Sequence, residues 1–222
     1  MTLGDLPDTL PIFPLGGALL LPRSDLPLNI FEPRYLRMVS DALKGPRLIG
    51  MVQPDSDQGL ADESNPQASP SIYGVGCAGR ITSFAETPDG RMMIVLTGIC
   101  RFRIRTEVPR GDLPYRVVQP DFESFKADLE DGPSFINLDR TVLQTAFDEL
   151  LGLDNMRIDW SEVADATDED LVNVLAMMSP YSPPEKQALL EAPDLSARAK
   201  VLSALTDIAL AEKKGHTRTL LN

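Results

Sequence analysis

Hydrophobic and polar residues alternate along several short segments in the first half of the chain. In the segment RFRIR at 101–105, Phe102 and Ile104 share one face and three arginines share the other. A period of two is typical of a strand with one buried face. Further strands are predicted at 10–15, 18–21, 48–52 and 115–119.

A Pro-Asp-Gly turn marks another run of predicted strands. In ETPDGR at 86–91, Pro88 presets φ and Gly90 tolerates a positive φ, which favours a tight reversal of the chain. The apolar segments ITSF and MMIVLT lie on either side of this turn. The pattern predicts a meander of three antiparallel strands over 75–105. Many short strands with one solvated face favour a small barrel over an open sheet.

One helix is predicted within this β-rich half, over about 33–44. Pro33 suits the first helical position, where its missing N–H would have no helical partner. Glu32 is then the N-cap, and Gly45 ends the helix. An apolar stripe follows helical spacing at Tyr35, Leu36, Val39, Ala42 and Leu43.

The second half of the chain repeats apolar residues at intervals of three and four, as amphipathic helices do. Thr167 and Ser182 each precede a possible capping partner, Asp170 and Glu185, and therefore predict two helix starts. The consecutive acids over 168–170 are expected to be a solvated cluster that supports one of these starts. Four helices are predicted, over 138–151, 168–178, 183–191 and 195–214.

Charge and turn-forming residues change near residue 120. Residues 1–120 carry 12 Lys+Arg and 13 Asp+Glu, whereas residues 121–222 carry 9 and 20, within a total charge of −12. The first part also holds 14 of the 19 prolines and 12 of the 15 glycines, which favours short elements with tight connections. We therefore predict a β-rich subdomain at 1–120 and an acidic α-helical subdomain at 121–222. The acidic balance argues against a generically basic nucleic-acid binder.

The sequence offers no recognisable catalytic or metal-binding constellation. Gly-Lys never occurs as a dipeptide, so the nucleotide-binding P-loop pattern is absent. There is no Gly-x-Ser-x-Gly elbow, and His216 is the one histidine, which argues against a Ser-His-Asp triad. Cys77, Cys100 and His216 are too few ligands for a tetrahedral zinc site. We expect no catalytic residue, no cofactor and no metal.

Cysteine usage and the chain start bear on location. Cys77 and Cys100 lie in separate apolar segments, where burial as free thiols is expected and one disulfide is the alternative. The opening MTLGDLPDTL has two acids and no basic region, unlike a secretory signal. The apolar runs LGGALLL and MMIVLTGIC are too short to span a bilayer. We expect a cytoplasmic protein with no membrane partner.

Two features are candidates for a binding surface. Arg101, Arg103 and Arg105 share one strand face and suit phosphates or carboxylates, with cross-strand ion pairs as the alternative. The pairs Met92-Met93 and Met177-Met178 carry flexible, polarisable side chains that suit an adaptable hydrophobic surface, with ordinary core packing as the alternative and with Met92 and Met177 as the candidate residues. Adjacent residues on a strand face opposite ways, so at most one of Met92 and Met93 is expected in the core.

The stretch LPIFPLGGALLLPRSDLPLNIFEPRYLRMV at 10–39 resembles the opening of the Lon-protease N-terminal, substrate-recognition domain. VGCAGRITS at 75–83 and LTGICRFRI at 96–104 are similar to further strands of that family. PEKQALLEAPDLSARAKVL at 184–202 resembles its helical close. The matching positions in the first stretch are Phe13, Pro14, Leu15, Leu21, Pro22, Leu28, Ile30, Phe31, Glu32, Pro33, Arg34 and Tyr35.

This resemblance implies an α+β fold, with a small PUA-like β pseudo-barrel followed by a C-terminal α-helical bundle. The sequence lacks the ATPase and peptidase domains of Lon, so it resembles the stand-alone Lon-domain proteins of bacteria. Such a protein is expected to bind polypeptide or unfolded segments without hydrolysing them, with a separate protease as a further expected partner. The alternative is an RNA-binding PUA-like module, which the acidic charge disfavours.

The IFEPRY motif is expected to be architectural. Phe31 and Tyr35 are then apolar anchors, Pro33 starts the helix, and Glu32 and Arg34 pair with neighbouring groups. Direct contact of these residues with a ligand is the alternative.

Overall fold

The computed structural model describes residues 1–55, 71–109, 111–130, 132, 136, 138–153 and 157–220. Contacts group the chain into two compact units. The barrel unit comprises Met1–Gly132 and Ser179–Leu190, and the helical unit comprises Pro133–Met178 and Glu191–Asn222. The subdomain boundary at residue 120 stays a prediction, and each unit is described below by itself.

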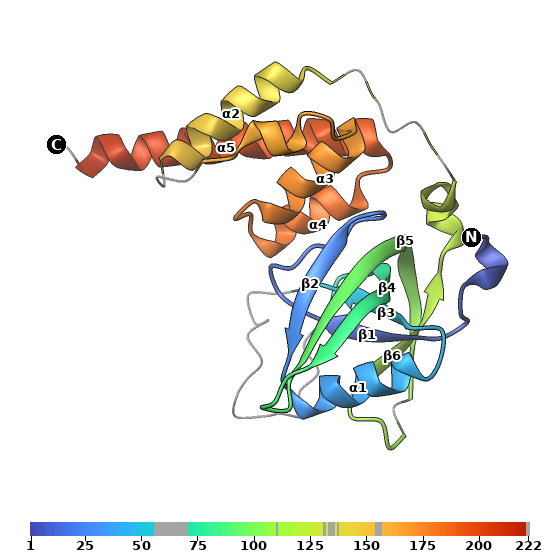
Figure 1. Cartoon of the computed structure of the whole chain (residues 1–222). Helices are drawn as coiled ribbons and strands as arrows, with labels where there is room; N and C mark the ends of the chain where they lie inside the picture. Colours follow the sequence, from blue (N-terminus) through green and yellow to red (C-terminus); the bar gives the residue numbers. More distant parts are fainter. Residues whose placement is uncertain are drawn as a thin grey trace. The chain divides into compact units, whose positions relative to one another are not determined.

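The barrel unit holds six strands among the described residues. These are β1 (Leu10–Pro14), β2 (Asp25–Ile30), β3 (Leu48–Val52), β4 (Val75–Glu86), β5 (Met92–Val108) and β6 (Arg116–Asp121). Their order is β2-β5-β4-β3-β1-β6, and β6 also pairs with β5. Five strands therefore close into a ring, while β2 is an additional strand on β5 (Figure 1). The pairing of β1 with β3 is parallel and the others are antiparallel.

The predicted meander over 75–105 is wrong in strand count, because two long strands replace three short ones. β4 and β5 form one hairpin around residues 87–91, and β5 continues without reversal through residues 98–102. The strand predicted at 18–21 is also wrong. Leu19, Leu20 and Leu21 are buried there but join no strand pairing. A Cβ atom at Gly98 would collide with the Leu21 carbonyl oxygen, so glycine at this position lets the segment cross β5 closely.

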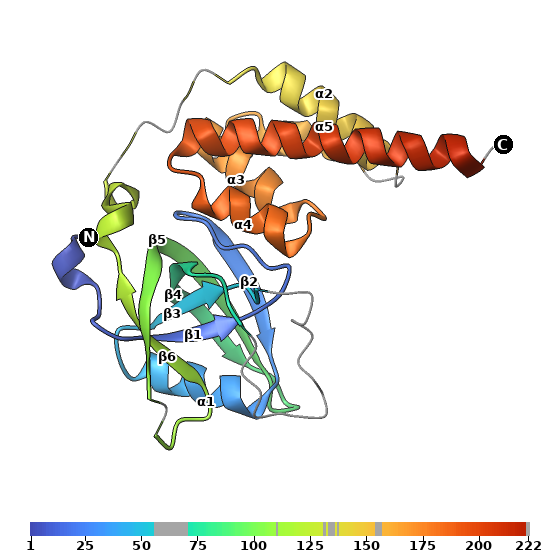
Figure 2. The same cartoon turned by 180° about the vertical axis from the view of Figure 1, so that it is seen from behind.

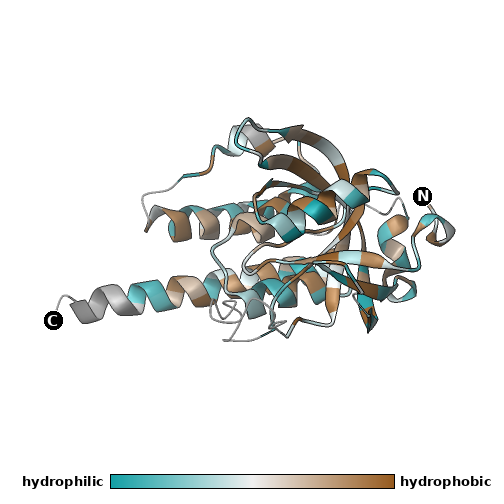
Figure 3. Ribbon diagram, turned by 90° about the horizontal axis from the view of Figure 1, so that it is seen from below, coloured by the Kyte–Doolittle hydropathy of each residue, from teal (hydrophilic) through white to brown (hydrophobic). Residues whose placement is uncertain are grey.

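Phe102 lies at the centre of the barrel core and is fully buried. Gly50 leaves room for its ring, because a Cβ atom there would lie 2.8 Å from the ring edge. Figure 3 shows hydrophobic residues concentrated along the strands of this unit, in keeping with a filled interior. The expected combination of a β pseudo-barrel with helices is confirmed.

The helix α1 (Pro33–Leu43) follows β2 and packs against β1 and β3. Glu32 is its N-cap residue and Pro33 occupies the first helical turn, as predicted. Tyr35 is buried and its ring centroid lies 4.2 Å from that of Phe13 on β1. The stripe of apolar residues thus fastens α1 to the barrel.

The four predicted helices of the second half are all present in the described residues. They are α2 (Arg140–Gly152), α3 (Asp168–Met178), α4 (Pro183–Glu191) and α5 (Leu195–Leu220). Within the helical unit α2 and α3 each pack against α5 (Figure 2). α4 through Leu190 belongs instead to the barrel unit, which composition did not indicate.

The predicted capping box at Thr167 is confirmed, and at Ser182 one of the two bonds of a capping box is present. The Thr167 hydroxyl accepts the Asp170 backbone N–H at 3.1 Å, and the Ser182 backbone N–H donates to the Glu185 carboxylate at 2.7 Å. The expected solvation of residues 168–170 is wrong for two of the three acids, because Asp168 and Glu169 are buried. Arg140 donates to the Asp168 carboxylate at 2.6 Å, which compensates the burial of that charge.

Candidate functional site

Residues 98–102 of β5, which include Arg101, lie at a gap in the strand pairing of the barrel, and we call this gap the seam. On one side β5 pairs with β2 through Met92–Thr97 and with β6 from Arg103 onward, so residues 98–102 lack a full strand partner there. The short helix η2 (Glu123–Leu129) packs against β5. Its Asp128 carboxylate accepts the Arg101 backbone N–H at 2.9 Å. Asp128 therefore supplies at the seam the acceptor that a neighbouring strand would otherwise provide.

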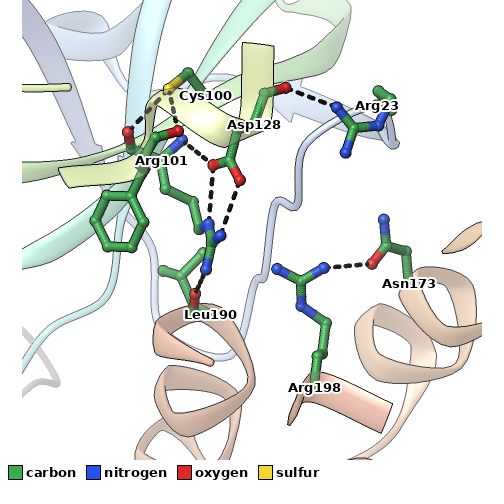
Figure 4. Close-up of polar contacts among 8 residues, drawn as sticks. Arg23, Cys100, Arg101, Asp128, Asn173, Leu190 and Arg198 are labelled. Atoms are coloured by element: carbon green, nitrogen blue, oxygen red, sulfur yellow. Dashed lines mark hydrogen bonds and ion pairs between the residues drawn. The ribbon is translucent and has the colours of Figure 1, made fainter. Parts of the chain in front are cut away.

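The Arg101 guanidinium is enclosed by the same carboxylate. Its Nε and Nη2 atoms donate to the two Asp128 oxygens at 2.9 and 2.8 Å, and Nη1 donates to the Leu190 carbonyl at 3.0 Å (Figure 4). The guanidinium also lies 4.5 Å from the centroid of the Phe125 ring. Arg101 is only 3% exposed, and this paired geometry suits a buried charge.

Cys100 and Arg23 complete the seam. The Cys100 thiol lies 3.5 Å from the Phe125 carbonyl oxygen, and Arg23 donates to the Asp128 carbonyl at 2.6 Å (Figure 4). Burial, followed by the nearby Asp128 carboxylate, raises the pKa of Cys100 to about 12. Both cysteines are free and buried, so the expectation of buried thiols is confirmed.

The other two arginines of the predicted binding surface have different surroundings. Arg103 is exposed and its guanidinium lies 5.6 Å from the Phe125 ring centroid. Arg105 is exposed and lies 3.4 Å from an Asp121 carboxylate oxygen. The period-two alternation places all three arginines on one face, but η2 and α4 cover Arg101. A ligand role for the stripe stays a prediction.

Buried polar side chains hold α4 to the barrel. Lys186 donates to the Gly17 carbonyl at 2.6 Å, and Gln187 donates to the Val75 carbonyl at 3.1 Å. Gln53 donates to the Pro183 carbonyl at 3.2 Å. Burial lowers the pKa of Lys186. These contacts join residues more than 100 positions apart, which explains why α4 belongs to the barrel unit.

The opposite end of β5 presents large apolar side chains to solvent. Met93 is 45% exposed and lies directly opposite Asn29 on β2 and Ala85 on β4. Phe84 is 49% exposed, and Phe31, immediately after β2, is 61% exposed. The pairing of Ile30 with Met92 and of Met92 with Glu86 places all three at one end of these strands. Phe84 is paired with the buried Ile94, so its side chain lies on the opposite face of the sheet from Met93. We call Phe31 and Met93 the apolar tip.

The IFEPRY residues divide between the core and this tip. Tyr35 is a buried anchor, as expected, but the expected anchoring role of Phe31 is wrong because its ring lies in solvent. Arg34 pairs with Glu32 at 2.7 Å and lies 4.5 Å from the Tyr35 ring centroid. Whether the motif also contacts a ligand stays a prediction.

The two candidate methionines lie in different units. Met92 is half-buried in β5, beside the exposed Met93, and Met177 is half-buried in α3 of the helical unit. The sequence pattern indicated Met93 only as the neighbour of Met92, and it did not single out Phe84, which precedes the turn at 87–91. It also missed Asp128, for which no local pattern exists.

Within the described part of the chain, no helix is both long and apolar enough to cross a bilayer. The same residues contain no group of three or more His, Cys, Asp or Glu side chains arranged to hold a metal ion.

A small closed β unit with one added strand, together with a helical unit, defines the class of fold. The family model of the ATP-dependent protease La (LON) substrate-binding domain matches residues 9–207. The chain belongs to this family.

Known relatives agree over most of this chain. Lon protease 2 of Sorangium cellulosum is 29% identical over 89% of this chain, and Lon protease 2 of Myxococcus xanthus is 26% identical over 90%. The chain spans only 24% of the length of either relative.

Solved structures show the same fold. The Lon N-terminal domain protein from Xanthomonas campestris superposes with a TM-score of 0.60 at 25% identity, covering 88% of this chain and 97% of that one. The N-terminal domain of Mycobacterium avium complex Lon protease gives a TM-score of 0.54 at 18% identity, covering 90% and 98%.

Proposed function

We propose that this chain binds polypeptide segments through the apolar tip and does not itself change them chemically. The observation that carries the proposal is the exposure of Phe31 and Met93 at the same end of the paired strands β2 and β5, each close to half exposed or more. Exposed apolar clusters of this kind commonly mark interaction sites. Membership in a family of substrate-binding domains supports a polypeptide as the ligand.

The chemistry of the tip suits unfolded segments. Burying one Phe or Met side chain contributes about 1.5–3 kcal/mol, so contact with both Phe31 and Met93 supports measurable affinity. Methionine adapts its shape to different apolar partners, which suits a ligand of variable sequence. The Arg91 guanidinium, 5.9 Å from the Phe31 ring centroid, adds a cation beside this apolar surface.

A cytoplasmic location and a separate protease that receives the bound polypeptide are further parts of this proposal. The support is that the aligned relatives are Lon proteases of which this chain matches about a quarter. RNA binding is the weaker alternative, because η2 and α4 cover Arg101 and the chain carries a charge of −12.

The test measures binding of fluorescent, reduced and carboxymethylated α-lactalbumin by anisotropy. The double variant Phe31→Ser/Met93→Ser is expected to weaken binding about tenfold or more, because two apolar contacts are lost. Met178→Ser is the matched control, since Met178 is 73% exposed but lies in the helical unit.

Equal binding by the double variant and the wild type would remove the apolar tip as the site. Absence of wild-type binding would contradict polypeptide binding itself. A parallel titration with single-stranded RNA addresses the alternative, since affinity for RNA would fall steeply with added salt.

A further inference from the structure

Among the described residues, β2 pairs with a strand on one side only. It is the terminal strand in the sheet order, and the described residues contain no strand beyond it. Its side chains follow a regular pattern, with Asp25, Pro27 and Asn29 exposed and Leu28 and Ile30 buried. An edge strand of this kind has backbone groups that its single partner cannot use.

The outward-facing backbone groups can be assigned from one contact at the start of β2. The Gly98 N–H of β5 donates to the Ser24 carbonyl at 2.9 Å, so Ser24 faces β5. In an antiparallel pair the residues alternate between facing the partner and facing away. Residues 26, 28 and 30 therefore face β5, whereas residues 25, 27 and 29 face outward. Pro27, which has no N–H, lies in the outward set, as this assignment requires.

The free edge thus offers the carbonyl groups of Asp25, Pro27 and Asn29 and the N–H groups of Asp25 and Asn29. Within the described residues, no backbone hydrogen bond other than those to β5 reaches residues 25–30. Asn29 also lies in the same cross-strand row as Met93 of the apolar tip. A strand added beyond Asn29 would extend that row, so one of its side chains would project on the face that carries Met93.

We propose that an extended polypeptide segment adds to the free edge of β2 as a further strand. This inference rests on the proposed function and specifies how the polypeptide is held. Backbone hydrogen bonds to Asp25 and Asn29 supply sequence-independent affinity, and the apolar tip favours segments with hydrophobic residues. Pro27 removes one donor from the middle of the edge, which limits uncontrolled pairing between strands.

The decisive pair of variants is Asn29→Pro and Asn29→Ala. Proline at 29 removes the outward N–H and breaks no bond to β5, since residue 29 faces away from it. Alanine removes the same side chain but retains the N–H. The probe is a fluorescent synthetic peptide of alternating valine and threonine, measured by anisotropy. We expect about tenfold weaker binding by Asn29→Pro and a change within about twofold for Asn29→Ala.

Pro27→Ala provides the opposite test, because it restores the missing donor. It is expected to strengthen binding about threefold. The same peptide, N-methylated at every second residue, is expected to bind the wild type about tenfold more weakly. If Asn29→Pro proves unfolded by circular dichroism, Pro27→Ala and the methylated peptide decide the question.

The outcomes separate the two levels of the proposal. Suppose that the wild type binds unfolded α-lactalbumin, but that neither Asn29→Pro and Pro27→Ala nor N-methylation of the peptide changes the affinity for the peptide. That result would overturn strand addition and leave polypeptide binding intact. Failure of the wild type to bind either the peptide or unfolded α-lactalbumin would overturn both.

Discussion

Two stretches of β5, residues 92–97 and 98–102, depart in opposite ways from the usual burial of apolar side chains and exposure of charged ones. At 98–102 a charged side chain, Arg101, is buried and all its guanidinium nitrogens have acceptors. At 92–97 an apolar side chain, Met93, is exposed at the end of the strand where Phe31 is also exposed. One strand thus combines a sealed polar seam with an open apolar end. The comparison indicates which part of the strand serves stability and which part is available for binding.

The difference arises from the elements that lie beside each stretch of β5. The seam lacks a strand on one side, so η2 and α4 must supply acceptors for buried donors. The open end has β2 and β4 on its two sides, so its backbone is satisfied and its side chains remain available. Substitutions at the seam should therefore change stability, and substitutions at the tip should change binding.

Arg101→Ala is expected to have the largest effect on stability. It leaves the Asp128 carboxylate buried without its cation, which typically costs about 3–5 kcal/mol. The free energy of unfolding is measured by urea titration followed by circular dichroism. Arg105→Ala is the matched control on the same strand face, and its exposed ion pair contributes at most about 1 kcal/mol. Equal losses for the two variants would contradict the distinction between a sealed seam and an exposed surface.

The buried Cys100 thiol makes the stability of the seam depend on pH. Burial raises the pKa of its thiol to about 12, whereas an unfolded cysteine ionises near 8.5. The folded state retains the proton longer, so the stabilisation is complete below about pH 8.5 and is lost as pH rises toward 12. Between pH 8 and pH 10 the wild type should lose about 1.5–2 kcal/mol more stability than Cys100→Ala.

Urea titrations of both proteins at several pH values check this expectation. The comparison of slopes removes contributions from other groups, because both proteins share them. If the free energy of unfolding changes with pH in the same way in both proteins, burial at the seam does not disfavour the Cys100 thiolate.

Much of the fold follows from sequence, but the seam does not. Local patterns predicted α1 through Pro33, the capping boxes at Thr167 and Ser182, and the turn at Gly90, because each depends on residues a few positions apart. The partnership of Arg101 with Asp128 and Leu190 depends on closure of the barrel and on the return of α4. A period of two predicts which face Arg101 occupies, but it cannot indicate what later covers that face.

The candidate site was predicted only in part for a related reason. Strand alternation predicts that at most one of Met92 and Met93 is buried, but it does not indicate which. For Phe31, hydrophobicity favours burial and gives no reason to expect exposure. Exposure follows from where β2, β4 and β5 end together, which is a property of strand register. The segment at 18–21, predicted as a strand, shows the same dependence, because this apolar run is buried without joining the sheet.

Arg34→Ala is expected to have the smallest effect, because Arg34 lies between these two extremes. Its side chain is 39% exposed, pairs with the similarly exposed Glu32, and lies over the buried Tyr35 ring. Loss of the half-exposed ion pair and the cation–π contact should cost about 0.5–1 kcal/mol, or about 1–4 °C in melting temperature. Arg34→Lys retains the charge but not the planar guanidinium, so it should recover only part of the loss. Melting is followed by circular dichroism, and binding of unfolded α-lactalbumin is measured on the same samples. A lower melting temperature with unchanged binding would support an architectural role for the motif. An unchanged melting temperature with lost binding would instead indicate that Arg34 belongs to the binding surface.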